Sequence, residues 1–268
     1  TLLALAAVTA ILFAAPLRCK APAALAIVGA GALWGCTQAV ATLAGVPERL
    51  LWLLPGTLFG GDSGSMDSLS ALFVLIVSVG SLAATAYSRG YLARYLPLKS
   101  PAHISLHYTA LVVLFYAMLG VVLSDGGYSF LFFWELMTVA SFLLILFDAE
   151  RREVRRAALS YLIMMHIGFV LLVVGFVRLE AVTGSAAFGA LAEYFRTQPA
   201  LPLFAVFLAG FGMKAGLFPM HVWLPEAHPA APSHVSALMS GVMIKTGVYG
   251  ILRTTAALGE LPALRTAG

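Results

Sequence analysis

Apolar stretches, each close to the length that crosses a bilayer, account for most of this chain. A spanning helix needs about 20 mostly apolar residues. The sequence predicts eight such segments: Leu2–Pro16, Ala23–Ala44, Met66–Tyr87, His107–Leu123, Gly127–Phe147, Ala157–Val177, Leu201–Phe218 and Ser233–Leu252. Hydrophobic residues make up 61% of the 268 residues and charged residues only 10%, too few charges to cover a soluble surface. We therefore expect an all-α integral membrane protein.

Positive charges are unevenly shared between the loops on the two sides of the predicted bundle. One set of alternate loops holds nine, against three in the other: Arg18, Lys20, Arg89, Arg94, Lys99, Arg151, Arg152, Arg155 and Arg156, against Arg49, Arg178 and Arg196. The positive-inside rule then places the N-terminus outside and the first set in the cytoplasm, in a multi-pass protein of the cell membrane. This asymmetry explains the basic pI of about 9.2 without nucleic acid as a partner. We expect an external loop at 46–65, a short interfacial piece at Ala187–Phe195 and a solvated turn at Asp148–Arg156.

Three charged residues lie inside predicted spans, namely Glu135, Lys214 and Lys245. A charge at the bilayer centre costs about 2.5–3.5 kcal/mol on insertion scales, and such residues are functional by default. At 1.5 Å per residue, Glu135 is about 15 Å from Asp125 and about 20 Å from Asp148, near mid-membrane. It either handles ions or is a protonated acid hydrogen-bonded to a neighbouring helix.

Lys214 is surrounded by Gly210, Gly212 and Gly216, and Pro219 follows. Proline removes a helical hydrogen bond and glycines weaken the helix, so this pattern predicts a broken seventh segment. Broken helices in transporters mark ion or substrate sites. The alternative is a kinked helix with a snorkelling lysine.

Lys245 follows Ser240 and Gly241 in the next segment. We expect both lysines to be buried, with few acids nearby. Burial and mutual repulsion then disfavour their charged forms, so that they exchange protons near physiological pH.

Histidines His221, His228 and His234 follow the predicted break, beside Glu226. Their spacing fits no metal motif, and we expect a proton relay rather than a metal site. His166 is either part of such a path or a hydrogen-bonded core residue.

Nucleotide, dinucleotide, haem and nucleophile-elbow motifs are absent, and Cys19 and Cys36 form no redox or zinc pattern. We therefore expect no cofactor and no redox chemistry in this chain, and a transport function.

Two stretches of the sequence resemble one family. The stretch from Lys214 to Gly250, K-A-G-L-F-P-M-H-V-W-L-P-E-A-H-P-A-A-P-S-H-V-S-A-L-M-S-G-V-M-I-K-T-G-V-Y-G, closely resembles the signature of antiporter-like proton-pumping subunits. F-F-W-E-L-M at 132–137 looks like their glutamate motif. Such subunits occur in respiratory complex I, multisubunit sodium/proton antiporters and energy-converting hydrogenases. The first stretch is most similar to the hydrogenase-4 and formate hydrogenlyase branch.

The resemblance implies the first of two inverted five-helix repeats, and other membrane subunits and a peripheral redox arm as partners. Glu135 would pair with Lys214 and tune its proton affinity, and Lys245 would pass the proton inward. We expect N-terminal helices and the external loop at 1–126, a proton-translocation core at 127–255 and a terminal segment at 256–268. The second repeat is not in these residues, so we expect a truncated chain.

Two other functions stay open. A multisubunit sodium/proton antiporter would need clustered carboxylates for sodium, and only one deep acid is visible. A non-pumping membrane anchor would gain nothing from buried charge.

Overall fold

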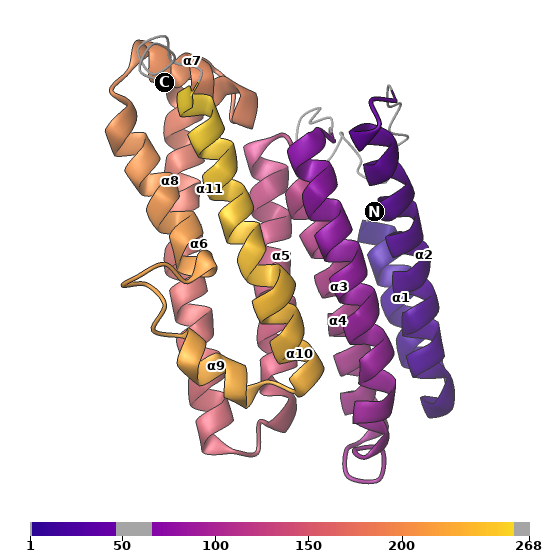
Figure 1. The fold of residues 1–268 in the computed structure, drawn as a ribbon. Coiled ribbons are helices and arrows are strands. Elements are labelled where there is room, and N and C mark those ends of the chain that lie inside the picture. The colour runs from indigo at the N-terminus through magenta and orange to yellow at the C-terminus, as the bar shows by residue number, and fades with distance from the viewer. Residues whose placement is uncertain (1, 47–65, 260–268) are drawn as a thin grey trace.

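The computed structural model describes residues 2–46 and 66–259 as a bundle of helices that run side by side (Figure 1). Its elements in chain order are α1 (Leu2–Ala14), α2 (Leu17–Leu43), α3 (Ser68–Ala93), α4 (Pro101–Leu123), α5 (Gly127–Ile145), the 3₁₀ turn η1 (Leu146–Asp148), α6 (Arg152–Thr183), the 3₁₀ turn η2 (Phe188–Ala190), α7 (Leu191–Thr197), α8 (Ala200–Ala215), α9 (Leu224–Ala230), α10 (Ser233–Leu238), the π-helical turn η3 (Met239–Met243) and α11 (Ile244–Gly259).

The expected all-α membrane architecture is confirmed. Within the described ranges, six helical segments are long and apolar enough to cross a membrane: Leu17–Leu43, Ser68–Ala93, Pro101–Leu123, Gly127–Asp148, Arg152–Thr183 and Ser233–Gly259. The two remaining predicted segments are the shorter apolar helices α1 and α8. The predicted loop at 46–65 lies outside the described residues except for its first.

Several charged residues expected in loops lie inside helices. The charged turn predicted at Asp148–Arg156 is shorter than expected because α6 begins at Arg152. Lys20 lies inside α2 and is buried, and its Nζ donates to the carbonyl oxygens of Leu12 at 2.7 Å and Phe13 at 3.1 Å. These carbonyls are at the end of α1, where helical partners are missing. A basic side chain can therefore belong to a helix end when its amine reaches free carbonyls or water.

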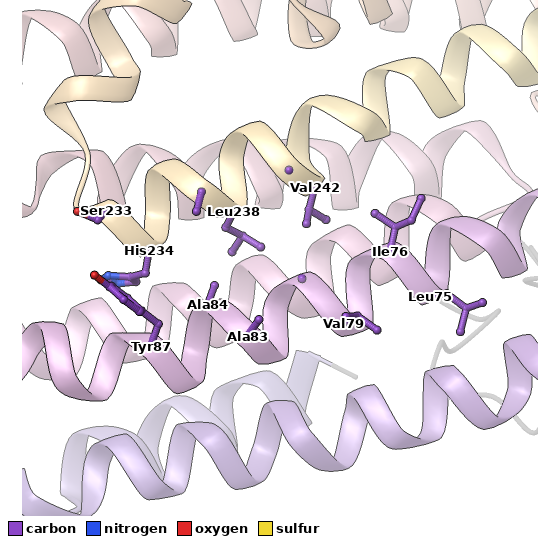
Figure 2. Close-up of a pocket in the computed structure, with 13 residues that line it drawn as sticks. Leu75, Ile76, Val79, Ala83, Ala84, Tyr87, Ser233, His234, Leu238 and Val242 are labelled. Carbon is purple, nitrogen blue, oxygen red and sulfur yellow. The ribbon is translucent and has the colours of Figure 1, made fainter.

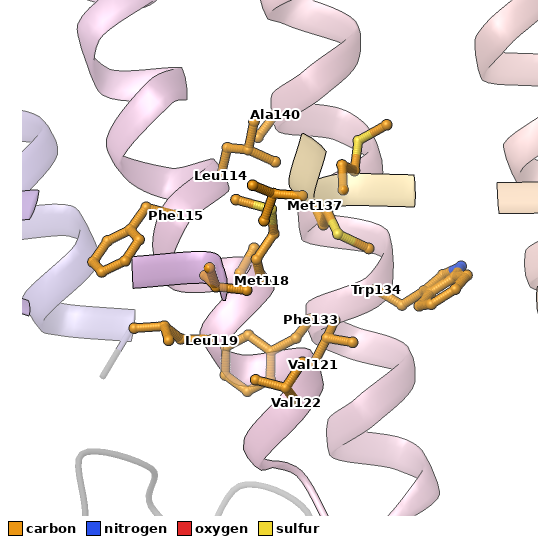
Figure 3. Packing of buried hydrophobic residues seen from close by; sticks show 14 of the residues in the cluster. Leu114, Phe115, Met118, Leu119, Val121, Val122, Phe133, Trp134, Met137 and Ala140 are labelled. Carbon is orange, nitrogen blue, oxygen red and sulfur yellow. The ribbon is translucent and has the colours of Figure 1, made fainter. Parts of the chain in front are cut away.

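Helix α4 forms the centre of the core and packs closely on α5. Figure 3 shows apolar side chains of both helices meeting, including Met118, Phe133 and Met137. A Cβ atom on Gly120 would lie 2.3 Å from the ring of Phe133. The absence of a side chain there lets the two helices approach, as is common between membrane helices.

The short piece predicted at Ala187–Phe195 is helical, as η2 and α7. Figure 1 shows α7 lying across one end of the bundle. Leu191, Tyr194 and Phe195 are buried, so its apolar face packs on protein.

Candidate functional site

Helix α8 ends one residue after Lys214. The C-cap Gly216 has φ 70°, and the N–H groups of Gly216 and Leu217 both donate to the carbonyl of Gly212. Glycine adopts this left-handed conformation without steric cost, which is why it ends many helices. The chain then runs without regular helix to α9, as Figure 1 shows. The predicted broken segment is confirmed.

The side chain of Lys214 lies in the interior of the bundle with 1% of its surface exposed. Its Nζ donates to Thr138 Oγ1 at 2.7 Å and lies 4.8 Å from the centre of the Trp134 ring. An aromatic face attracts an ammonium group, and a hydroxyl oxygen accepts from an amine in either protonation state. Across the described residues Lys214 has no ion pair. The position suits an amine that changes protonation.

Glu135 contacts His166 rather than Lys214. Its Oε1 lies 3.1 Å from His166 Nε2, and its buried Oε2 has no hydrogen-bond partner among the described residues. Residues three apart on a helix are separated by about 60° around its axis, so Glu135 turns toward α6 while Thr138 faces Lys214. The direct Glu135–Lys214 pairing implied by the resemblance is therefore not observed.

His166 lies beside Glu135, and its ring contacts two groups. Its Nδ1 lies 2.9 Å from the carbonyl oxygen of Leu162, while Nε2 faces Glu135. The side chain is 49% exposed, so the alternative of a core histidine is wrong.

Helix α5 carries a ladder of polar side chains formed by Glu135, Thr138 and Ser141. Ser141 Oγ lies 2.6 Å from the hydroxyl of Tyr161, and both residues are buried. Each member of the ladder meets a side chain from α6 or α8. Sequence reasoning identified only the glutamate of this ladder. The other two members could have been found from the sequence, because they are hydroxyl residues three and six positions after Glu135 in an apolar run.

Lys245 is exposed, so its predicted burial is wrong. The reason is its position around α11. Gly247 faces α8 so closely that a Cβ atom there would lie 2.6 Å from the backbone nitrogen of Ala215. Residues two apart on a helix point about 160° apart, so Lys245 projects away from α8. The π-helical turn η3 immediately before α11 was not predicted; such turns are frequent at functional sites.

The three histidines after the break lie in three different settings. His234 is buried, with its Nε2 2.8 Å from the Nε2 of His107. His228 Nδ1 contacts Ser236 Oγ at 3.0 Å, and His221 packs near the ring of Phe218. These contacts do not connect the three histidines into one relay. No group of metal-ligating side chains that could hold an ion is found in the described part of the chain.

A groove of about 860 Å³ runs between α3 and α10–η3. Figure 2 shows apolar side chains such as Val79, Leu238 and Val242 along it, with His234 beside Tyr87 near one end. The groove is therefore apolar for most of its length, and the buried histidine pair lies near its polar end.

A comparison with family models matches residues 124–263, just over half of the chain, to the family described as "NADH:quinone oxidoreductase/Mrp antiporter, TM". The chain belongs to this family. The match contains α5, α8 and α11, and with them the polar ladder and both lysines. The family assignment made from the two motifs is confirmed.

Curated relatives come from more than one kind of membrane complex. An uncharacterised protein of Mycobacterium tuberculosis is 40% identical over 75% of this chain and 30% of its own length. Hydrogenase-4 component B of Escherichia coli is 37% identical over 70% of this chain and 27% of its own. A putative antiporter subunit of Staphylococcus aureus is 34% identical over 72% of this chain and 24% of its own. The matched part thus spans less than a third of each of these relatives.

Solved structures support the same fold. The Mrp complex of Dietzia sp. contains a chain that superposes with a TM-score of 0.75 at 22% identity, covering 94% of this chain and 46% of that one. A chain of the archaeal membrane-bound sulfane sulfur reductase superposes with a TM-score of 0.80 at 20% identity, covering 99% of this chain and 53% of that one. At these identities the likeness concerns the antiporter-like fold alone.

Proposed function

We propose that this family member is part of a membrane subunit that translocates protons, with Glu135, Lys214 and Lys245 as the groups that carry the charge. The observation that carries the proposal is the setting of Lys214, a buried amine at a helix break with a hydroxyl acceptor and no ion pair among the described residues. Burial of a charge is costly, and a purely structural lysine would gain nothing from it.

In this mechanism Lys214 is the proton-exchanging group and Glu135 controls it from one turn away on α5. His166 shields or releases the carboxylate, because its ring contacts Oε1. A change in the charge of the Glu135–His166 pair alters the electrostatic potential at Lys214, although neither residue bonds to Lys214 directly. Lys245, exposed on α11, receives the proton at a later step. His221, His228 and His234 lie on the segment between the lysines and are candidates for separate proton-transfer steps, because each has a different partner.

We propose coupling to electron transfer through a peripheral redox arm, in a complex with other membrane subunits. The relation to hydrogenase-4 component B supports this choice. The relation to an antiporter subunit makes a sodium/proton antiporter the second candidate. A sodium site favours several carboxylate and carbonyl oxygens, whereas Glu135 lies beside a histidine.

The proposed core is 127–255, preceded by the helices and loop of 1–126 and followed by the segment 256–268. We place the protein in the cell membrane with its N-terminus outside, on the distribution of lysine and arginine.

The test is proton pumping by the intact complex in vesicles. We expect Lys214→Ala, Lys245→Ala and Glu135→Gln each to lower pumping at least about tenfold, as is usual for groups that transfer protons. Gly259→Ala is the matched control, because a Cβ atom there would meet none of the described residues within 4 Å.

The readouts separate the candidates. Unchanged pumping in all three variants would overturn the proton-path proposal and favour a membrane anchor. Pumping that depends on a sodium gradient would favour the antiporter.

A further inference from the structure

His107 and His234 form a buried pair of imidazoles on two different helices. Their Nε2 atoms are 2.8 Å apart, and the residues are 4% and 2% exposed. His107 is on α4 and His234 is on α10, so 127 residues separate them in sequence. At this distance one Nε2 carries a proton and the other accepts it.

The pair has no partner that would hold it in one charge state. Neither ring forms an ion pair with a carboxylate among the described residues, and the other nitrogen of each ring, Nδ1, is buried without a hydrogen-bond partner there. Buried polar atoms almost always have partners. The two Nδ1 atoms without partners lie at opposite ends of the hydrogen-bonded pair. They are the positions where a proton can enter and leave.

Other titratable groups surround the pair on the side of the α3–α4 and α5–α6 connections. His103 lies one turn before His107 on α4, and both rings pack against Phe147, at 5.1 and 4.9 Å. Tyr91 from α3 packs on His234 at 5.2 Å, with its hydroxyl 3.5 Å from that of Tyr95.

An ionic cluster lies just beyond Phe147. Lys99 Nζ contacts Asp148 at 3.1 Å and Glu150 at 2.8 Å, and lies 5.5 Å from the Phe147 ring. This cluster gathers charge at the end of the bundle, and the same Phe147 ring contacts Lys99, His103 and His107.

Resting on the proposed function, we propose that His107 and His234 act as one proton-transfer element on the route that supplies the core. A proton binds Nδ1 of His107, the Nε2 proton crosses to His234, and a proton leaves from Nδ1 of His234. One proton enters and one leaves, and no electrons are exchanged. The two rings end with their tautomers exchanged and are reset before the next transfer.

A purely structural pair that ties α4 to α10 makes a different prediction. Glutamine can replace Nε2 as a hydrogen-bonding group, but its amide does not carry a proton from one side to the other. His107→Gln therefore preserves the link and removes the transfer.

The experiment measures pumping and redox turnover by the intact complex in vesicles for His107→Gln, His234→Gln and the double variant. We expect each single variant to lower pumping at least about tenfold. The double variant should lose no more than either single one, because residues acting as a unit are not additive. Tyr108→Phe, at a buried neighbour on α4, is the control and should pump normally.

A second measurement tests the pair even if a variant fails to assemble. Nitrogen-15 NMR of the histidine-labelled wild-type complex should show a scalar coupling between two Nε2 atoms across the hydrogen bond. No such coupling, or normal pumping in both glutamine variants, overturns the proposal. Normal pumping in these variants with loss of pumping in Lys214→Ala overturns the histidine element alone; normal pumping in all of them removes the proposed function as well.

Discussion

Lys214 on α8 donates a hydrogen bond of 2.7 Å to Thr138 on α5, and both side chains are buried. The Thr138 hydroxyl donates its own proton to the carbonyl of Trp134 at 3.1 Å. Its oxygen is therefore left as an acceptor directed at the lysine. This arrangement holds the Lys214 amine against α5, one turn from Glu135. Thr138 is therefore the residue that positions Lys214 directly.

Replacing Thr138 by valine should weaken both the fold and the transport. Thr138→Val keeps the shape but leaves Lys214 without its described acceptor, and an unsatisfied buried donor costs about 1–3 kcal/mol. We expect a lower thermal unfolding midpoint of the purified complex and slower pumping in vesicles. Thr138→Ser retains the hydroxyl and should stay close to wild type; equal behaviour of the two variants would contradict the role of this hydrogen bond.

Removing His166 should affect transport more than stability. The Glu135–His166 contact is partly exposed, and the His166 side chain lies outside the buried core, so replacing its ring leaves no cavity there. His166→Phe should therefore leave the unfolding midpoint nearly unchanged. Because it removes the group that contacts the carboxylate, the pumping yield per electron should change. A large loss of stability with an unchanged yield would make His166 a structural residue. Ile167→Phe, at an exposed neighbouring position, is the control.

The helices and the break could be predicted because local chemistry determines them. Each of the eight predicted apolar segments contains a helix in the described part of the chain, and the glycines around Lys214 with Pro219 predicted where α8 ends. These features depend on residues close together in sequence. Glu135 and Lys214 were likewise identified without knowledge of the packing, because each is an isolated charged residue in an apolar stretch.

The partners could not be predicted because they depend on rotation and packing of whole helices. Which side of α11 faces α8 is decided by the close approach at Gly247, and this exposes Lys245. The contact of Glu135 with His166 depends on how α5 is rotated against α6. The pairing of His107 with His234 joins residues 127 positions apart, and nothing in the local pattern of either helix indicates it.

Low pH should weaken the attachment of α11 to α3. Asp67, just before α3, pairs with Arg253 on α11 and accepts from the N–H of Ser70 at 2.8 Å. Burial alone would raise the pKa of Asp67, but the hydrogen bond from Ser70 and the charge of Arg253 outweigh it and hold the pKa below its ordinary value. A lowered pKa means that, between the two pKa values, the folded protein binds fewer protons than the unfolded chain. The free energy of unfolding therefore decreases as the pH decreases.

The contribution of Asp67 should therefore be complete above about pH 4, the ordinary value for aspartate, and disappear as pH falls through the lowered pKa. The measurement is the unfolding midpoint against pH for wild type and Asp67→Asn. The variant should be less stable at neutral pH and converge with wild type in acid. A constant difference at all pH values would show that the carboxylate charge is not responsible.

Gly247 should be intolerant of any side chain. A Cβ atom there would lie 2.6 Å from the backbone nitrogen of Ala215 and 2.8 Å from the carbonyl oxygen of Phe211. Backbone atoms cannot move aside as a flexible side chain can, so Gly247→Ala must push α11 away from the end of α8, next to Lys214. Overpacking of this kind costs about 1–3 kcal/mol.

We expect Gly247→Ala to lower the unfolding midpoint and to slow pumping together, because the displaced helices carry Lys214 and Lys245. Gly241→Ala is the matched control: it lies in η3 of the same span, and a Cβ atom there would meet no atom of the described residues within 4 Å. That variant should assemble and remain as stable as wild type. If both alanine variants behave alike, the close approach of α8 and α11 does not determine the position of the lysines.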